Sequence, residues 1–260
     1  MGKMTISKKN GKRAVSLLCR HNQNRGKNRV IVVSSGSPFR IIKKLVNEFP
    51  NFRIAMIDKD PLGGICLTRG CVPTKLMLYS AELISLFNES SSLCVDAEIK
   101  NIRFRDIMHR TRSYIQNRVS DKRSFINNHD NIDYYAGIAQ FIEPYTLKIG
   151  NDLLKGENII LCLGSEPFIP PIEGIKTVDY YTNKNILKMD HLPSSMVFIG
   201  GGFISIEFGF FFSRMGVEVT IIEGKDRILG PVEPEISNVI YQELSDHLEI
   251  HTSSQVISIR

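Results

Sequence analysis

The sequence predicts an α/β protein that consists of two successive three-layer units, each with helices packed on a mainly parallel sheet. The prediction rests on a pattern that occurs twice, over 29–58 and over 196–223. In each segment a short apolar strand, a turn, a helix with 3.6-residue spacing and a second strand ending in an acid follow one another. The chain has 260 residues, 42% of them hydrophobic, so it can bury the cores of two domains.

We expect a basic leader over 1–29, a first domain over 30–166 and a second domain over 167–260. The leader has nine Lys or Arg and no acid, whereas the rest of the chain has 24 basic and 27 acidic residues. Because the net charge of +6 arises in the leader, it does not indicate a nucleic-acid partner. The leader lacks the apolar core of a secretory signal and the amphipathic face of a transit peptide. It is interpreted as a disordered tail, or as an extension from a misassigned start codon.

The apolar segments and the cysteines indicate where the protein works. No stretch has the length and hydrophobicity of a transmembrane helix, so we expect no membrane partner. Five cysteines in a chain of this size are typical of a reducing compartment, which predicts a cytoplasmic protein. Three of the cysteines are interpreted as structural thiols, namely Cys19, Cys94 and Cys162.

The first unit begins with an apolar run over 29–33, which is typical of a strand buried on both faces of a parallel sheet. A turn over 34–38 follows, and apolar residues then recur at helical spacing over 39–49. The segment 52–58 reads as a second buried strand. Strand, turn, helix and strand in this order form a βαβ unit, the building block of Rossmann-like folds.

Such a unit binds a dinucleotide when the phosphates approach the helix N-terminus and an acid accepts hydrogen bonds from the ribose. Asp58 ends the second strand, 24 residues after Ser34, close to the usual interval of about 20. The three positions that favour glycine in this fingerprint hold Ser34, Gly36 and Phe39, so only the middle glycine is present. A nucleotide site with a modified loop is therefore predicted, although strand–turn–helix segments without a ligand are common.

Two cysteines five residues apart, Cys66 and Cys71, lie between a pair of glycines and Pro73. Residues five apart in a regular helix are too distant for an unstrained disulfide, so a bridge requires a distorted chain, which Gly70 allows. Strained, accessible disulfides are the reducible ones. Cys71 would lie in the first turn of the helix that Pro73 begins, where a thiolate is favoured. Redox chemistry is favoured over two buried small hydrophobes or half of a metal site, because we find no second ligand pair and expect no metal.

Between the cysteines and the second unit, the pattern predicts two helices followed by short strands. The helices are expected over 73–87 and 104–126, the short strands over 132–149 with turns at Gly137 and Pro144, and a buried strand over 158–163 followed by Gly164. His109 in the second helix is interpreted as a surface residue. A proline-rich link over 167–171 is expected to mark the domain boundary.

The second unit matches the dinucleotide fingerprint more closely than the first. The strand over 196–199 leads into three glycines, Gly200 to Gly202, and Ser205 is a small third residue of the pattern. A helix over 203–215 and a strand over 217–222 follow, and Glu223 ends the unit. An acid at this position accepts bonds from a free 2′-hydroxyl and repels a 2′-phosphate, which favours NAD over NADP. Two nearby cations, Lys225 and Arg227, could partly offset that repulsion.

Two nucleotide units around a cysteine pair resemble the class I pyridine nucleotide-disulfide oxidoreductases, especially dihydrolipoamide dehydrogenase and its mercuric reductase relatives. The resemblance covers 30–260, and its most specific part is the cysteine motif over 63–75. The segments 158–167 and 200–207 resemble the family's later strand and its second nucleotide loop. The resemblance implies an FAD/NAD(P)-binding fold.

The resemblance also implies a role for each motif. FAD would occupy the first unit and NAD the second. Cys71 would be the charge-transfer thiol beside the flavin, and Cys66 would exchange with a dithiol or disulfide substrate, for which lipoamide is the first candidate. Lys75 would lie beside the flavin N5 and pair with Glu207, although both could be ordinary surface charges. The implied cofactor-binding residues are Ser34, Gly36, Asp58, Gly63, Gly64, Lys75 and Gly164 in the first domain, and Gly200, Gly202, Glu207 and Glu223 in the second.

The chain departs from the family pattern in its length. It lacks the last strands of the nicotinamide domain, the family's later Gly-Asp motif and the dimer-interface domain, which supplies an acid-base histidine to the partner in the family's homodimers. None of the six histidines lies in such a motif. The chain is therefore either part of an oxidoreductase that needs a separate C-terminal half, as the intact cysteine motif favours, or a truncated, catalytically incompetent nucleotide-binding fragment, as the altered first loop favours. A third reading is a cysteine-pair redox protein without flavin.

Overall fold

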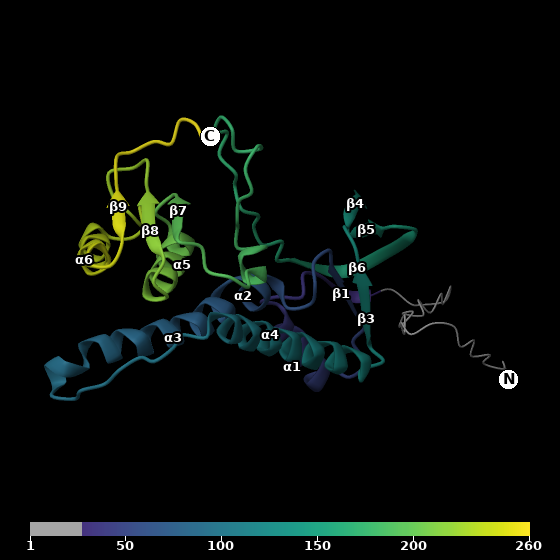
Figure 1. Ribbon diagram of the computed structural model, residues 1–260. Coiled ribbons are helices and arrows are strands. Elements are labelled where there is room, and N and C mark those ends of the chain that lie inside the picture. Colours follow the sequence, from purple (N-terminus) through teal and green to yellow (C-terminus); the bar gives the residue numbers. More distant parts are fainter. Residues whose placement is uncertain (1–27) are drawn as a thin grey trace, which may run out of the picture.

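The computed structural model describes residues 28–260, and the leader and Cys19 lie outside that range (Figure 1). The helices and strands form two sheets, one with six strands in the order β3-β2-β1-β6-β5-β4 and one with three in the order β7-β8-β9. The elements of the first part are β1 (Asn28–Val33), α1 (Phe39–Glu48), β2 (Ile54–Asp58), α2 (Gly64–Arg69), α3 (Cys71–Glu89), η1 (Ser90–Leu93), α4 (Phe104–Asn127), β3 (Ile132–Ala136), β4 (Gln140–Glu143), β5 (Thr146–Ile149) and β6 (Asp152–Leu161). Those of the second part are η2 (Ile186–Lys188), β7 (Ser195–Ile199), α5 (Phe203–Arg214), β8 (Glu218–Ile222), α6 (Pro234–Ser245) and β9 (Glu249–His251).

The parallel strands of the six-stranded sheet form the middle of three layers, between the helices and the meander. Strands β3, β2, β1 and β6 run parallel, and β6 continues into an antiparallel meander with β5 and β4. Residues along β1 alternate between faces, so Val30 and Val32 pack with α1 and α4 whereas Ile31 packs with Leu147 and Ile149 of the meander. Figure 1 shows α1 and α4 on one side of β1 and the meander on the other. This burial on both faces explains why β1 and β2 are apolar throughout.

A second hydrophobic core joins the long helices α3 and α4 to the three-stranded sheet. Helix α5 packs between α3 and strand β8, so the two sheets are connected through helix packing. The core contains large side chains from all of these elements, including Met77, Met108, Phe211, Phe212 and Ile221. The helix that follows the cysteine motif is therefore fixed directly against the first helix of the second unit.

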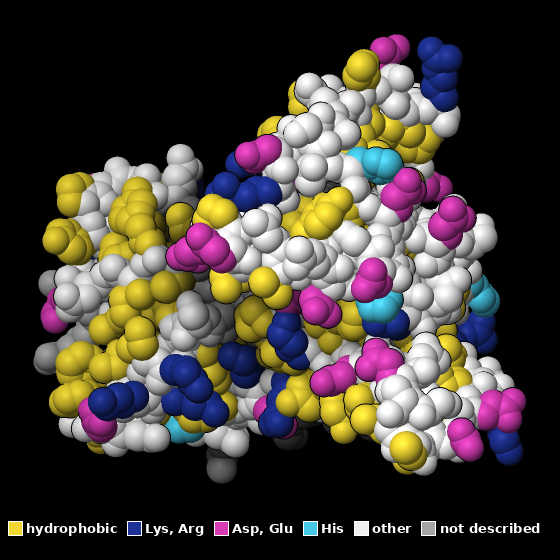
Figure 2. Space-filling model, turned by 90° about the vertical axis from the view of Figure 1, so that its left-hand side faces the viewer, with side chains coloured by type: hydrophobic (Ala, Val, Ile, Leu, Met, Phe, Trp, Pro, Cys, Tyr) yellow, Lys and Arg dark blue, Asp and Glu magenta, His cyan; other side chains and the backbone are white. Residues whose placement is uncertain are grey.

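Large hydrophobic side chains also remain exposed. Figure 2 shows several hydrophobic areas on the face that it presents, with Lys and Arg side chains between them. Tyr79, Leu83 and Leu86 form an exposed apolar stripe along α3. Within 28–260, no helix has both the length and the hydrophobicity needed to cross a bilayer.

The predicted α/β fold with two nucleotide-type units is confirmed, and most helices and strands begin and end within two residues of their predicted bounds. Helix α3 begins at Cys71 rather than at Pro73, so that prediction is wrong. The short helix α2, which carries Cys66, was not expected, nor were α6 and β9. The strands of each sheet lie within one of the two predicted domains, whose boundaries remain a prediction.

Candidate active site

The cysteine pair lies at a break between two helices. Cys66 is in α2, Cys71 is the first residue of α3, and Gly70 separates the helices with backbone angles of φ −135° and ψ −125°. A Cβ atom at Gly70 would lie 3.0 Å from the carbonyl oxygen of Ile65 and 3.2 Å from the Cα of Cys66. Because glycine permits this close approach, the chain folds back on α2, and Cys71 lies near enough to Cys66 to shift its pKa.

The first turn of α3 acts on Cys66. The two cysteines are thiols in the structure, and both are exposed. The hydrogen bond with the Cys71 side chain raises the pKa of the Cys66 thiol, and partial burial raises it further, while the backbone amides of Cys71 and Val72 oppose this shift. The effect of the helix N-terminus expected on Cys71 remains a prediction, and the backbone at the start of α3 acts on the pKa of Cys66. Since the net shift is upward, the Cys66 thiol is protonated over a wider pH range than a free cysteine.

An ion pair connects the helix of the cysteine motif to the second unit. Lys75 lies one turn after Cys71 on α3, and its Nζ donates to Oε1 of Glu207 on α5. The side chains of Lys75 and Glu207 are 63% and 27% exposed, so the pair adds little to stability. The pair contributes little to the stability of the fold, but it fixes the Lys75 charge between the cysteine motif and the second unit.

The first glycine loop is held by a serine and an acid. Ser34 has φ 143°, a conformation that favours glycine, so the serine occupies the turn under strain. The buried Ser35 donates from its amide nitrogen and its Oγ to Oδ2 of Asp58, at 2.7 and 2.5 Å. The amide of Gly63 donates to Ser35 Oγ at 2.9 Å. Ser35 therefore joins the loop, the acid at the end of β2 and the start of the cysteine motif.

Glycines allow this loop and the cysteine motif to touch. Gly64 has φ +68°, and a Cβ atom on it would lie 2.4 Å from the Cα of Gly36. On the other side, a Cβ on Gly164, which follows β6, would lie 2.8 Å from Cδ1 of Ile65. The predicted glycines Gly36, Gly64 and Gly164 are thus brought together around the beginning of α2, although they are far apart in the sequence.

In the second glycine loop, as in the first, the acid at the end of the second strand accepts a hydrogen bond from a loop amide, but the glycines have more open space beside them. Gly200 has φ +98°, and a Cβ on Gly200 or Gly202 would meet no atom within 4 Å. Oε2 of Glu223 accepts from the amide of Gly201 at 2.6 Å, and its Oε1 accepts from the amide of Lys225 at 2.8 Å. Arg227 donates to the carbonyl of Gly230 at 2.9 Å. The open side of this loop is therefore accessible to a ligand.

The acid at each loop can still accept a hydrogen bond from a dinucleotide. Asp58 accepts three hydrogen bonds, from the amide and hydroxyl of Ser35 and from the amide of Asp60 at 3.0 Å. Glu223 accepts two. Because a carboxylate has about four acceptor sites, each acid keeps capacity for a ribose hydroxyl. The residues present thus fit FAD at the first loop and a pyridine nucleotide at the second.

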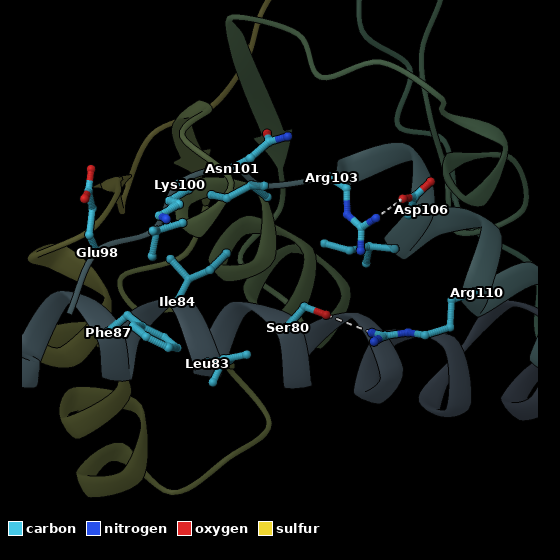
Figure 3. Close-up of a pocket in the computed structure, with 13 residues that line it drawn as sticks. Ser80, Leu83, Ile84, Phe87, Glu98, Lys100, Asn101, Arg103, Asp106 and Arg110 are labelled. Carbon is cyan, nitrogen blue, oxygen red and sulfur yellow. Dashed lines mark hydrogen bonds and ion pairs between the residues drawn. The ribbon is translucent and has the colours of Figure 1, made fainter.

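Two surface cavities lie along α3 and α4. The larger, about 700 Å³, is a groove lined by apolar residues such as Leu83, Ile84 and Phe87 together with charged residues from 98–110 (Figure 3). The smaller, about 650 Å³, is next to the cysteine motif and is lined by Cys71, Val72, Lys75, Leu76, Tyr79, Arg110 and Tyr114. Arg110 lines both and donates to Ser80 Oγ at 2.8 Å. A ligand in the smaller cavity would lie next to the Cys71 side chain.

Several residues around the site were not anticipated from the sequence. Ser35 lies between two predicted residues, and only its contacts with Asp58 and Gly63 distinguish it. Tyr79 of α3 and Arg110 of α4 line the cavity beside Cys71, and only Arg110 is brought there by tertiary packing. Spacing on α3 could have indicated Tyr79, because it follows Cys71 and Lys75 at intervals of four.

The fold and the site together define a class of redox proteins with two dinucleotide-type units and a cysteine pair on the helix that joins them. The family model described as pyridine nucleotide-disulphide oxidoreductase matches residues 29–260, and the chain belongs to this family. FAD and NAD(P)H are the cofactors of the family.

Named relatives support the same assignment. The chain is 28% identical to dihydrolipoyl dehydrogenase of Acholeplasma laidlawii over 87% of its own length and 69% of the relative. It is 26% identical to mercuric reductase of Lysinibacillus sphaericus, over 74% of this chain and 35% of the relative. For mycothione reductase of Mycobacterium tuberculosis the identity is 28%, over 88% of this chain and 50% of the relative.

A solved structure shows the same fold. The Cu(II) complex of the HOCl-induced flavoprotein disulfide reductase RclA from Escherichia coli superposes with a TM-score of 0.77 at 24% identity. The match covers 91% of this chain and 51% of that chain. The chain thus spans between about a third and two thirds of the length of these proteins.

Proposed function

We propose that this chain is the FAD- and NAD-binding part of a disulfide oxidoreductase that resembles dihydrolipoamide dehydrogenase. In this proposal electrons pass between NAD(H), flavin and the Cys66–Cys71 pair, and then to a dithiol or disulfide substrate. The observation that carries it is the juxtaposition of three parts: the cysteine pair, the Ser35–Asp58 loop and the Lys75–Glu207 ion pair. When bound, the flavin would supply the two-electron carrier between nicotinamide and disulfide.

The cysteines would complete the reaction by thiol exchange. Reduction of a Cys66–Cys71 disulfide takes up two electrons and two protons and gives two thiols. Cys66 then attacks a substrate disulfide and releases one substrate thiol, and Cys71 attacks the mixed disulfide, which releases the second and restores the bridge. Lipoamide is the first candidate substrate.

Full turnover is proposed to require a separate C-terminal half, assembled as in a homodimer of the full-length family. The alternative is a catalytically incompetent nucleotide-binding fragment. The two readings make different predictions for the purified chain with added FAD. We expect flavin to remain bound through gel filtration and to bleach when NADH is added without oxygen. A chain that binds nucleotide but never bleaches would support the alternative, and one that binds no flavin would overturn the proposal.

Nucleotide choice is expected to depend on Glu223. Because its carboxylate repels a 2′-phosphate, the wild-type chain should bind NADH more tightly than NADPH. The variant Glu223→Gln keeps an acceptor for the Gly201 amide but removes the charge, so the preference should shift toward NADPH by about tenfold, equivalent to ~1.4 kcal/mol. Nicotinamide fluorescence titrations measure both affinities. A wild-type preference for NADPH would contradict this assignment.

Breaking the Lys75–Glu207 pair should affect electron transfer more than stability. In Glu207→Gln the Lys75 charge lacks its partner. NADH-driven bleaching of the flavin should then slow on the order of tenfold, which corresponds to a rise of about 1.4 kcal/mol in the activation free energy. The free energy of unfolding, measured by urea denaturation, should fall by less than about 1 kcal/mol, because the pair is exposed. Glu48→Gln, which breaks the exposed Lys44–Glu48 pair on α1, is the matched control. Equal bleaching rates in the two variants would show that Glu207 has no special role.

A further inference from the structure

An aromatic shelf lies beside the first glycine loop. Phe39 occupies the third position of the fingerprint, where the pattern favours glycine. Its buried ring contacts Phe125 of α4 edge-on, with 5.5 Å between the ring centroids. The two rings fill the space between the start of α1 and the end of α4. We call this pair the Phe39–Phe125 shelf.

Two lysines flank the shelf from different helices. Lys122 Nζ of α4 lies 3.9 Å from the centroid of the Phe39 ring and 3.4 Å from the carbonyl oxygen of Ser35 in the loop. Lys43 Nζ of α1 lies 5.2 Å from the Phe125 centroid and 5.6 Å from that of Phe39. Cation–π contacts stabilise each lysine individually, but they bring two like charges to one side of the loop.

Within 28–260, neither lysine has a carboxylate partner. The first turn of α1 contains no acid, and no side chain caps this helix. Burial, and to a smaller extent the neighbouring charge of Lys43, together lower the pKa of Lys122 to about 8. Asp58, the acid that contacts this loop, accepts hydrogen bonds from the Ser35 amide and hydroxyl. The structure thus keeps an unbalanced positive charge at the N-terminal end of α1, where a bound anion would offset it.

We propose that Lys122, with Lys43 beside it, binds the pyrophosphate of FAD and compensates for Phe39 in place of a loop glycine. The inference rests on the proposed function, because it takes FAD as the ligand of the first unit. The contact with the Ser35 carbonyl holds the Lys122 ammonium at the loop that the fingerprint assigns to the phosphates. The aromatic shelf fixes its stem. Lys122 is 87 residues from Ser35 in sequence, so the fold creates the site.

The test compares FAD affinity in three variants of the chain by quenching of flavin fluorescence. Lys122→Met keeps a long apolar stem against Phe39 and removes the charge, so FAD binding should weaken by about tenfold or more, the usual effect of losing a hydrogen bond to a charged group. Lys122→Arg should restore most of the affinity. Lys44→Met, which removes an exposed lysine of α1 that pairs with Glu48, should bind FAD like the wild type.

Two further measurements separate binding from folding. The urea midpoint of the FAD-free Lys122→Met variant should remain close to that of the wild type, and its FAD affinity should depend less on salt because one phosphate contact is lost. Unchanged FAD affinity in Lys122→Met would show that the lysine only packs on the aromatic shelf and would overturn this inference alone. A wild-type chain that binds no FAD would overturn both this inference and the proposed function.

Discussion

Replacing either Cys66 or Cys71 by serine is expected to abolish reversible thiol–disulfide chemistry. The wild-type chain should show five reactive thiols under denaturing conditions after reduction and two fewer after mild oxidation. Each single variant should show four in both states, because the bridge needs both cysteines of the pair. Thiol counting with a chromogenic disulfide reagent measures this without any flavin.

The control for this prediction is Cys94→Ser. Cys94 is an exposed free thiol at the end of η1, outside the Cys66–Cys71 motif, so its variant should keep the two-thiol difference between oxidised and reduced protein. The redox interpretation would be wrong if the wild type gave the same count in both states, or if Cys94→Ser lost the difference as well. All NADH-driven disulfide reduction should also be lost in Cys66→Ser and Cys71→Ser.

Gly64→Ala is expected to have the largest effect on the structure of the site. The new Cβ would lie 2.4 Å from the Cα of Gly36, which is backbone and cannot move without opening the first loop. The positive φ of +68° adds strain of roughly 1–2 kcal/mol for any other residue. We expect a total loss on the order of 3 kcal/mol in unfolding free energy, together with loss of flavin binding. Urea unfolding and flavin retention on gel filtration measure the two effects.

Gly150→Ala is the control that has the backbone strain of a positive φ without a steric clash of the new Cβ. Gly150 has φ +56° but a Cβ on it would meet nothing within 4 Å, so its alanine variant should lose only about 1 kcal/mol and keep flavin. Equal losses in the two variants would mean that the contact between the first loop and the cysteine motif does not constrain the protein.

Local sequence patterns predicted the repeated βαβ units because burial on both faces and helical periodicity are local properties. The strand over 29–33 and the glycines at 200–202 could be placed from a few residues. Pro73 misled the placement of α3, because the first turn of a helix leaves its amides free and therefore accepts proline at any of its first positions. Helix α6 was missed although Pro234 and Glu235 at its start are typical helix signals.

Long-range contacts explain what local patterns could not predict. Helix α2 has six residues and no buried side chain, and it depends on the approach of Gly64 to Gly36. The sequence placed Cys66 and Cys71 in one motif, but only the fold shows that the backbone at the start of α3 acts on the pKa of Cys66. Lys122 had no local signal at all, because α4 carries it to the loop from 87 residues away.

We propose that this chain carries electrons from NADH through flavin to the Cys66–Cys71 pair. The most direct measurement is differential alkylation of the oxidised, FAD-loaded chain before and after anaerobic addition of NADH, with mass spectrometry to locate the labelled cysteines. The account predicts that NADH adds label at Cys66 and Cys71 and nowhere else, with no gain when FAD is omitted. Label at neither cysteine in a chain that retains FAD would contradict it.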